Sequence, residues 1–264
     1  METTNNNGEL DQLTNFLTDL RLKHWAGVIK TDLCVMPPQE QKFLLGHLLR
    51  WAETEKAERK ASLIASRVKG AKFKRIQTVD NFNFAYCKET LAIQKNYLAL
   101  YNEINPQSPP SAVFTGTSGA GKTHLSRALG YGACQKGMSV LFVTAAEMVN
   151  HLTHAQKTFN LELELNRYRR PQVLIIDELG YVTLDAQASN LFFQVISARH
   201  DQDLGIVTTT NIQFGKFNQI FANDAIAHAI VDRLVNDAEI FYMDGPSYRE
   251  HQRAQKQKAK NKDN

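Results

Sequence analysis

Cysteine is scarce in this chain of 264 residues, and its placement argues against cross-linking. The three cysteines, Cys34, Cys87 and Cys134, are far apart, odd in number and without a CxxC pair. Disulfide frameworks and structural zinc sites need pairs at short, regular spacing, so we expect reduced thiols that fill space. Histidine is scattered too: the one close pair, His151 and His154, has no carboxylate or cysteine nearby. No metal site is expected there.

Long hydrophobic runs are also lacking. No stretch approaches the roughly 20 uncharged apolar residues that span a bilayer. The first residues, METTNNNGELDQL, contain neither the basic nor the apolar region of a secretory signal. A cytoplasmic protein with no membrane partner is therefore expected. With 43% hydrophobic and 22% charged residues, the chain is ordinary globular material, long enough for one α/β domain and a smaller appendage.

Charge is the first property that points to a partner. The net charge is only +4, but residues 56–75 carry eight basic residues and a single acid. The basic residues are Lys56, Arg59, Lys60, Arg67, Lys69, Lys72, Lys74 and Arg75. A second basic run, between Arg253 and Lys262, predicts a disordered basic tail over residues 250–264. Both runs can neutralise DNA phosphates, and the alternative is that they form solvated surfaces.

Hydrophobic spacing divides the chain at about residue 110. Helical periodicity predicts a small all-helical domain over residues 1–75, with a new helix after Pro37 and Pro38, and then a linker and helix over residues 76–110. From residue 111 to 249, short apolar runs alternate with helical stretches: AVFTG, SVLFV, VLIID, GIVTTT and EIFYM. This alternation predicts a parallel five-stranded α/β sheet with helices on both faces.

A phosphate-binding motif gives the strongest chemical indication. Residues 116–123 match GxxxxGK[ST], and they lie between an apolar run and a helical stretch, which is the context that the motif requires. The residues predicted to bind nucleotide are Gly116, Thr117, Ser118, Gly119, Ala120, Gly121, Lys122, Thr123 and His124. Lys122 would reach the β- and γ-phosphates of ATP, and the Thr123 hydroxyl would bind Mg²⁺. The alternative is a glycine-rich turn that binds no nucleotide.

The apolar run VLII is followed by two acids, Asp177 and Glu178. In an open α/β sheet, a carboxylate at the carboxyl end of a strand lies beside the phosphate loop, so Asp177 can hold Mg²⁺ and Glu178 can polarise the attacking water. Asn211 ends a later apolar run and can bind γ-phosphate and water, depending on where its strand lies. A turn at the two acids, and capping before Phe214, are the alternatives.

The motifs together resemble the AAA+ superfamily, and more closely the IstB family of transposition-helper ATPases from bacterial insertion sequences, which are related to DnaC helicase loaders. The segments that carry the resemblance are GKTHL (121–125), IIDELGY (175–181), TTTN (208–211), VDRLV (231–235) and SYR (247–249). It implies an AAA+ P-loop fold with a very short lid, because only fifteen residues follow Arg249.

The resemblance also implies roles for particular residues. Asn211 becomes the sensor 1 residue, Arg249 the sensor 2 arginine of its own subunit, and Arg233 an arginine finger that reaches the ATP of a neighbouring subunit. Active sites would then lie between the subunits of a homo-oligomer. An added helix over residues 158–170 would face DNA, with Lys157, Arg167, Arg169 and Arg170 as phosphate contacts beside Lys69, Lys72, Lys74 and Arg75. Surface ion pairs and solvated helix ends are the alternatives.

Four functions are compatible with these features. The first is a DNA transposition regulator that uses ATP and Mg²⁺ to assemble on duplex DNA, largely independently of its sequence, to deform it and to deliver it to the transposase encoded by the same element. The second is a DnaC-like helicase loader that acts on a replicative helicase and single strands; no cluster of exposed aromatic residues for base stacking is evident in residues 111–249. An ATP-locked scaffold is disfavoured by Glu178, and a small-molecule kinase leaves Arg233 unexplained.

Overall fold

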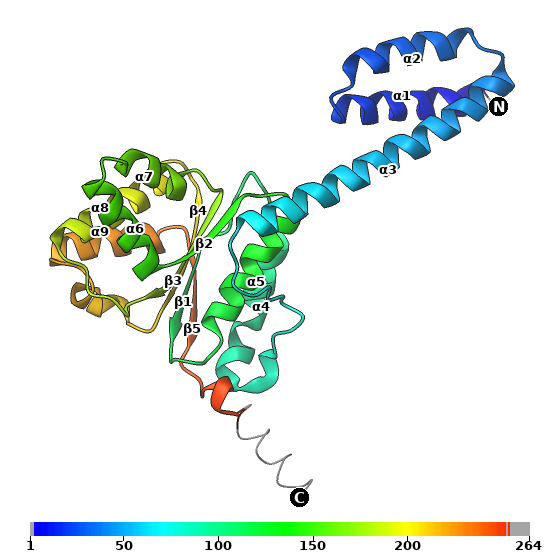
Figure 1. The fold of residues 1–264 in the computed structure, drawn as a ribbon. Coiled ribbons are helices and arrows are strands. Elements are labelled where there is room, and N and C mark those ends of the chain that lie inside the picture. Colours follow the sequence, from blue (N-terminus) through cyan, green and yellow to red (C-terminus); the bar gives the residue numbers. More distant parts are fainter. Residues whose placement is uncertain (1–2, 252, 254–264) are drawn as a thin grey trace, which may run out of the picture. The chain divides into compact units, whose positions relative to one another are not determined.

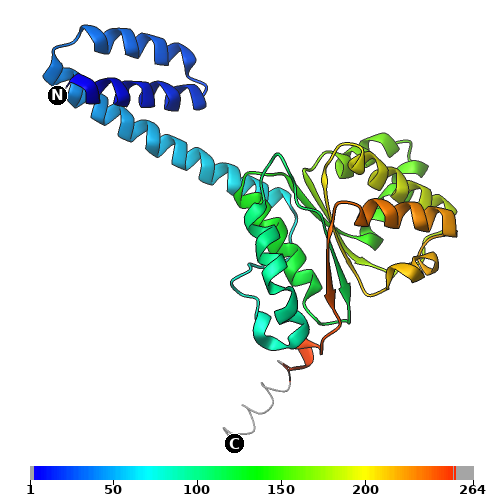
Figure 2. The ribbon, with the colours of Figure 1, turned by 180° about the vertical axis from the view of Figure 1, so that it is seen from behind.

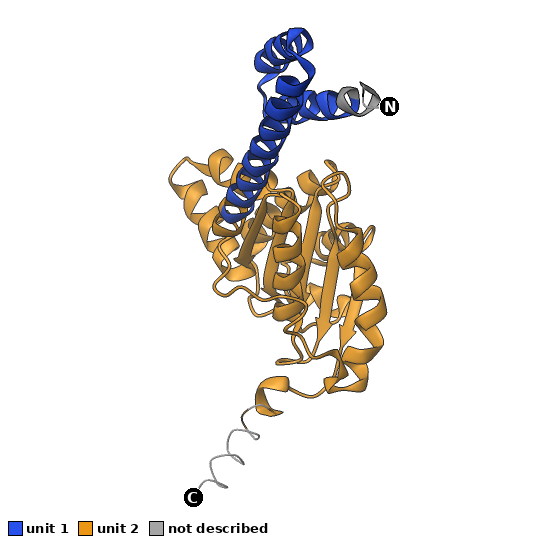
Figure 3. Cartoon of the chain, turned by 90° about the vertical axis from the view of Figure 1, so that its right-hand side faces the viewer, with its two compact units in different colours: residues 1–65 blue, residues 66–264 orange. Residues whose placement is uncertain are grey.

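The chain forms two compact units, residues 1–65 and residues 66–264 (Figure 3). The structure, a computed structural model, describes residues 3–251 and residue 253. Most of the predicted tail, residues 250–264, therefore lies outside the described residues.

The first unit is built from helices alone, as its periodicity predicted. Its elements are α1 (Thr3–Asp19), α2 (Lys23–Val35) and the first part of α3 (Pro38–Gly70). Leucines at three- and four-residue spacing form its core, and Leu13, Leu33 and Leu45 are almost completely buried. One apolar stripe on each helix meets the others and is removed from water, which stabilises the unit.

The second unit is a parallel sheet between two layers of helices (Figures 1 and 2). The strands are β1 (Ala112–Gly116), β2 (Val140–Thr144), β3 (Val173–Leu179), β4 (Gly205–Thr210) and β5 (Glu239–Met243). They pair in the order β2-β3-β4-β1-β5, and every pairing is parallel. The predicted five-stranded α/β sheet is thus confirmed. In it, β4 lies between β1, which precedes the phosphate loop, and β3, which carries the two acids.

Helices cover both faces of this sheet. One face packs against α4 (Lys88–Glu103) and α5 (Lys122–Gln135). The other packs against α6 (Ala145–Lys157), α7 (Leu161–Arg169), α8 (Ala186–His200) and α9 (Asp224–Val235). Short 3₁₀ helices, η1 (Phe84–Tyr86) and η2 (Phe214–Gln219), lie in the connections. Successive strand residues face opposite layers: Ile175 joins the α4/α5 core and Ile176 the other. Both faces are therefore buried, which explains the continuous apolar runs.

The second unit begins well before residue 111. Residues 76–110 were expected to be a linker and a helix, but their apolar side chains pack on the sheet domain: Phe84, Tyr97 and Ile104 are buried in its core, and Val79 and Phe82 pack against it. The spacing of these apolar residues suits an extended linker when read alone. Burial against α5 and the sheet, which no local pattern reveals, makes the segment part of the domain.

Candidate functional site

A cavity of about 740 Å³ lies over the phosphate loop of the second unit. It is lined by residues of that loop, by Glu178 and Asn211 from the neighbouring strand ends, and by Arg249 near the end of the described chain. The carboxyl ends of parallel strands meet at one edge of the sheet, which is where open α/β sheets bind ligands. The sheet order therefore brings together residues that are separated by more than a hundred positions.

The phosphate loop is held in shape by its own lysine. The Nζ atom of Lys122 donates to the carbonyl oxygens of Gly116 and Thr117, each at 2.7 Å. Gly121, with φ of 103°, is the residue before α5, so the loop turns directly into the positive end of a helix dipole. Burial lowers the pKa of Lys122, while the carboxylate of Asp177 opposes that shift. This geometry can cradle a polyphosphate.

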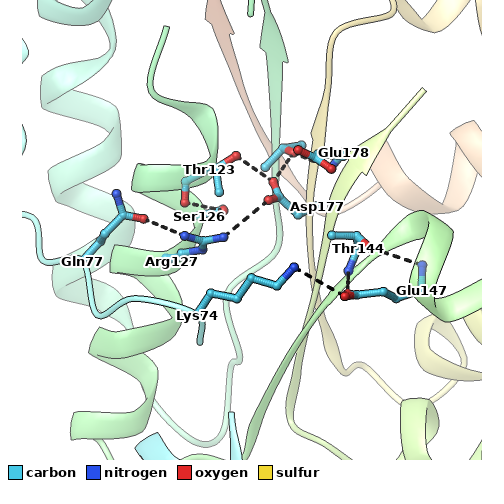
Figure 4. A network of polar contacts seen from close by, with 10 residues as sticks. Lys74, Gln77, Thr123, Ser126, Arg127, Thr144, Glu147, Asp177 and Glu178 are labelled. Carbon is cyan, nitrogen blue, oxygen red and sulfur yellow. Dashed lines mark hydrogen bonds and ion pairs between the residues drawn. The ribbon is translucent and has the colours of Figure 1, made fainter. Parts of the chain in front are cut away.

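Asp177 is the centre of a polar network under the loop (Figure 4). Its Oδ1 atom accepts hydrogen bonds from the hydroxyls of Thr123 at 2.9 Å and Thr209 at 2.6 Å. The guanidinium of Arg127 lies 3.9 Å from its Oδ2 atom and also donates to Gln77. Asp177 is only 2% exposed, so these partners offset the cost of burying its charge.

The Thr123 hydroxyl and the Asp177 carboxylate suit magnesium. Mg²⁺ prefers oxygen ligands and usually takes one or two from the protein, with the rest from phosphates and water. The hydrogen bond between these two side chains shows that both can reach one point beside the phosphate loop. Among the described residues, no group of three His, Cys, Asp or Glu side chains that could hold a metal ion is found.

The two adjacent acids have opposite environments because the strand is irregular between them. The register of β3 against β4 shifts between Ile176 and Leu179, and Glu178 has φ of 63°. Its backbone N–H donates to the Thr209 hydroxyl at 2.9 Å, and its side chain is exposed in the cavity. A β-bulge that re-aims one side chain is common beside functional sites. The bulge thus buries Asp177 and presents Glu178 to a ligand.

Of the other predicted catalytic residues, Asn211 and Arg249 line this cavity, whereas Arg233 lies elsewhere. The side chain of Asn211 lies close to Gly180, just after the bulge: a Cβ atom at Gly180 would be only 2.9 Å from the Asn211 Oδ1 atom. Arg249 lines the same cavity and contributes to lowering the pKa of Lys122 electrostatically. Arg233 instead lines a separate hollow near the amino ends of the strands, where its guanidinium donates to Ala229 and stacks on a phenylalanine ring.

Several residues that the sequence did not single out also line the cavity. His124 was predicted from the motif; its ring makes a hydrogen bond with the Thr78 carbonyl and contacts Phe82, and burial lowers its pKa. Tyr86, Arg127 and Tyr248 were missed. Arg127 lies four residues after Thr123, on the same face of α5, so helical spacing could have indicated it. Tyr86 lies in the segment that was expected to be a linker.

The residues predicted to contact DNA are dispersed. Lys74 and Arg75 line the nucleotide cavity, and Lys74 pairs with Glu147 at 3.4 Å. Arg167 and Arg169 pair with Glu164 and Glu162 on their own helix. The expected added helix is present as α7. Of the eight residues predicted to contact DNA, Lys69, Lys72, Arg75, Lys157 and Arg170 are exposed and make no hydrogen bond or ion pair with the described residues.

Sequence comparison identifies relatives of this chain. The model of the IstB-like ATP binding protein family matches residues 17–256. The chain belongs to this family. A protein of insertion sequence IS5376 from Geobacillus stearothermophilus, named for ATP binding, is 34% identical over 81% of this chain and 84% of its own length. The corresponding protein of IS232 from Bacillus thuringiensis subsp. berliner is 31% identical over 90% of this chain and 94% of its own.

Structural comparison confirms the AAA+ P-loop fold of this IstB-like protein. The DnaC helicase loader superimposes with a TM-score of 0.55 over 63% of this chain and 96% of its own, at 18% identity. AMPPCP-bound DnaA from Aquifex aeolicus gives 0.50 over 63% of this chain and 50% of its own, at 17% identity. In the described part of the chain, no helix combines the length and apolarity needed to cross a membrane.

Proposed function

We propose that this IstB-like protein is an ATPase that assembles on duplex DNA, deforms it and delivers it to the transposase encoded by the same insertion sequence. The observation that carries the proposal is the composition of the nucleotide cavity. Lys122, Asp177, Glu178 and Arg249 gather there, whereas Arg233 lies at the other end of the strands. A cavity that needs Arg233 must take it from a second copy of the chain.

Each group in the cavity has a step to perform. The loop and Lys122 bind the phosphates of ATP, and Thr123 and Asp177 would hold the Mg²⁺ that neutralises them. Glu178 accepts a proton from the attacking water, and Asn211 orients that water beside it. Hydrolysis removes the γ-phosphate contacts of Arg249 and of the neighbour's Arg233. ATP therefore favours the assembly, and its hydrolysis resets it.

The DNA part of the proposal rests on charge and on the relatives. Residues 56–75 are strongly basic, and Lys69, Lys72, Lys157 and Arg170 are exposed cations. Contacts of this kind to the DNA backbone give binding that depends little on base sequence and weakens with salt. Relatives of similar length are named for their insertion sequences, which supports transposition rather than helicase loading.

The test is binding of the purified full chain to long duplex and to single-stranded DNA, with ATP, with ADP and without nucleotide, reading affinity and particle size. We expect ATP to drive growth of a large particle on duplex DNA, and expect Lys122→Ala and Arg233→Ala to abolish it. Lys95→Ala, which removes an exposed cation outside the cavity, is the matched control. Addition of the transposase should then yield ATP-dependent recruitment to the same DNA. Preference for single strands, or no particle on DNA, would favour the helicase-loader function instead.

A further inference from the structure

Arg249 belongs to a short segment that lies directly on the phosphate loop. The backbone N–H of Tyr248 donates to the carbonyl oxygen of Gly119 at 3.1 Å. Gly119 has φ of 82°, and a Cβ atom there would lie 2.3 Å from the Ser247 hydroxyl oxygen. Only glycine permits this approach. Immediately before the segment, the Thr117 hydroxyl donates to the Gly245 carbonyl at 2.6 Å.

Tyr86 holds the same segment from the other side. Its hydroxyl donates to the carbonyl oxygen of Ser247 at 3.3 Å. Its ring meets the ring of Tyr248 edge to face, with centroids 4.9 Å apart, and lies 5.1 Å from the ring of His251. Aromatic pairs in this geometry contribute attraction beyond the apolar area that they bury. Residues on both sides of Arg249 are thus fixed by a single side chain from η1.

Arg249 shares the cavity with two other cations. Lys122 and Arg127 are already there, and Arg249 acts on both as a like charge that favours their neutral forms. Like charges in a partly buried site repel one another until an anion joins them. The carboxylates of Asp177 and Glu178 oppose this repulsion. The contacts of Tyr86 add a restraint on the segment that does not depend on charge.

We propose that Tyr86 is a positioning residue, which holds the segment Ser247–His251 against the phosphate loop so that Arg249 enters the ATP cavity of its own subunit. In this role η1 supports the segment that carries Arg249. The proposal rests on the proposed function, because it assumes that the cavity binds ATP. It also explains why a residue more than 160 positions from Arg249 lines the same cavity.

The proposal is tested on the full chain by measuring Kd for ATP and for ADP without DNA, and kcat and KM for hydrolysis with duplex DNA. The variants are Tyr86→Ala, Tyr86→Phe, Arg249→Ala, the double variant Tyr86→Ala/Arg249→Ala, and Lys122→Ala. Tyr242→Ala is the matched control, because it removes an exposed tyrosine of β5 that lies outside this cavity. Circular dichroism and thermal melting establish that each variant is folded.

We expect Tyr86→Ala and Arg249→Ala each to weaken ATP binding about tenfold, the value of one hydrogen bond to a charged group, and to affect ADP less. The double variant should bind ATP no more weakly than Arg249→Ala alone, since both changes remove the same interaction. Tyr86→Phe keeps the ring contacts and should lose less than Tyr86→Ala.

The opposite results overturn the proposal. Multiplicative losses in the double variant would mean that Tyr86 does not act through Arg249. Equal weakening of ATP and ADP by Tyr86→Ala would make this ring a wall for the base or the ribose instead. If Lys122→Ala abolishes ATP binding while Tyr86→Ala binds as the wild type does, the positioning role alone fails. If Lys122→Ala also binds ATP as the wild type does, both the positioning role and the proposed function fail.

Discussion

At the scale of single residues, the contrast between Asp177 and Glu178 is the clearest link between backbone and chemistry. Asp177 is buried and accepts two hydroxyl hydrogen bonds, so its carboxylate is fixed and oriented. Glu178 sits at a β-bulge with positive φ and points into the cavity. A bulge costs backbone strain, and that strain is retained where it places a functional side chain. We therefore propose that Glu178 is the group that acts on water.

Glu178→Gln tests this assignment. Glutamine keeps the size of the side chain but cannot accept the proton of the attacking water, so we expect ATP binding to persist while kcat falls about 10²–10³-fold. Binding is measured by isothermal titration and hydrolysis by phosphate release. Glu103→Gln, which changes an exposed carboxylate at the end of α4, serves as the control and should retain wild-type kcat. Wild-type hydrolysis by Glu178→Gln would remove Glu178 from the mechanism.

At the scale of elements, the turn between α6 and α7 stands out. The N–H of Asn160 bonds the carbonyl of Ala155 at 2.9 Å, which closes α6 in a Schellman-type end. The residue in the left-handed position is Phe159, with φ of 58°, where glycine is usual. Its side chain is 98% exposed. No cluster of exposed aromatic residues is evident from the sequence of this domain. Phe159 is a single exposed aromatic residue, and its exposure could not be predicted from the sequence.

Phe159→Gly should stabilise the folded protein. Glycine adopts the left-handed conformation without steric cost, so we expect the free energy of unfolding to rise by about 1 kcal/mol. Urea denaturation followed by circular dichroism measures it. Phe159→Ala is the matched control, because it removes the ring but keeps the Cβ atom that causes the strain. If the glycine and alanine variants are equally stable, the backbone at this turn is not strained.

At the scale of the whole molecule, one chain does not bring all the predicted groups together. The nucleotide cavity contains Lys122, Glu178 and Arg249, while Arg233 on α9 lies at the opposite end of the strands. The sheet fixes both positions, because β4 and β5 flank β1 and α9 connects them. A rearrangement within the chain that moved Arg233 to its own cavity would have to disrupt this packing. We therefore propose that the active unit is a pair of neighbouring copies.

Mixing two inactive variants tests this composite site. Lys122→Ala lacks the lysine that we propose binds phosphate, and Arg233→Ala lacks the proposed arginine finger, so each alone should lose nearly all hydrolysis. In a mixture, the nucleotide cavity of an Arg233→Ala subunit still contains Lys122. A neighbouring Lys122→Ala subunit can supply the intact Arg233 to that cavity. We expect the mixture to regain a substantial share of wild-type ATPase activity, measured by phosphate release in the presence of duplex DNA. A mixture as inactive as its components would mean that Arg233 acts in its own subunit or only stabilises α9.

The sequence by itself determined the parallel sheet, the phosphate loop and the pair of acids near the carboxyl end of β3. Each of these features is formed by consecutive residues. The loop from Gly116 to Thr123 lies between a strand and a helix, and an apolar run is followed by Asp177 and Glu178. Such features depend on local geometry and on the burial of both sheet faces, which a linear pattern records.

The tertiary structure decided which distant residues share the cavity. Tyr86 reaches it because residues 76–110 pack on α5, and Arg249 reaches it because the segment after β5 docks on the phosphate loop. Arg233 is kept away from it by the position of α9. These outcomes depend on strand order and on side-chain packing between segments far apart in the chain, and no periodicity within one segment carries that information.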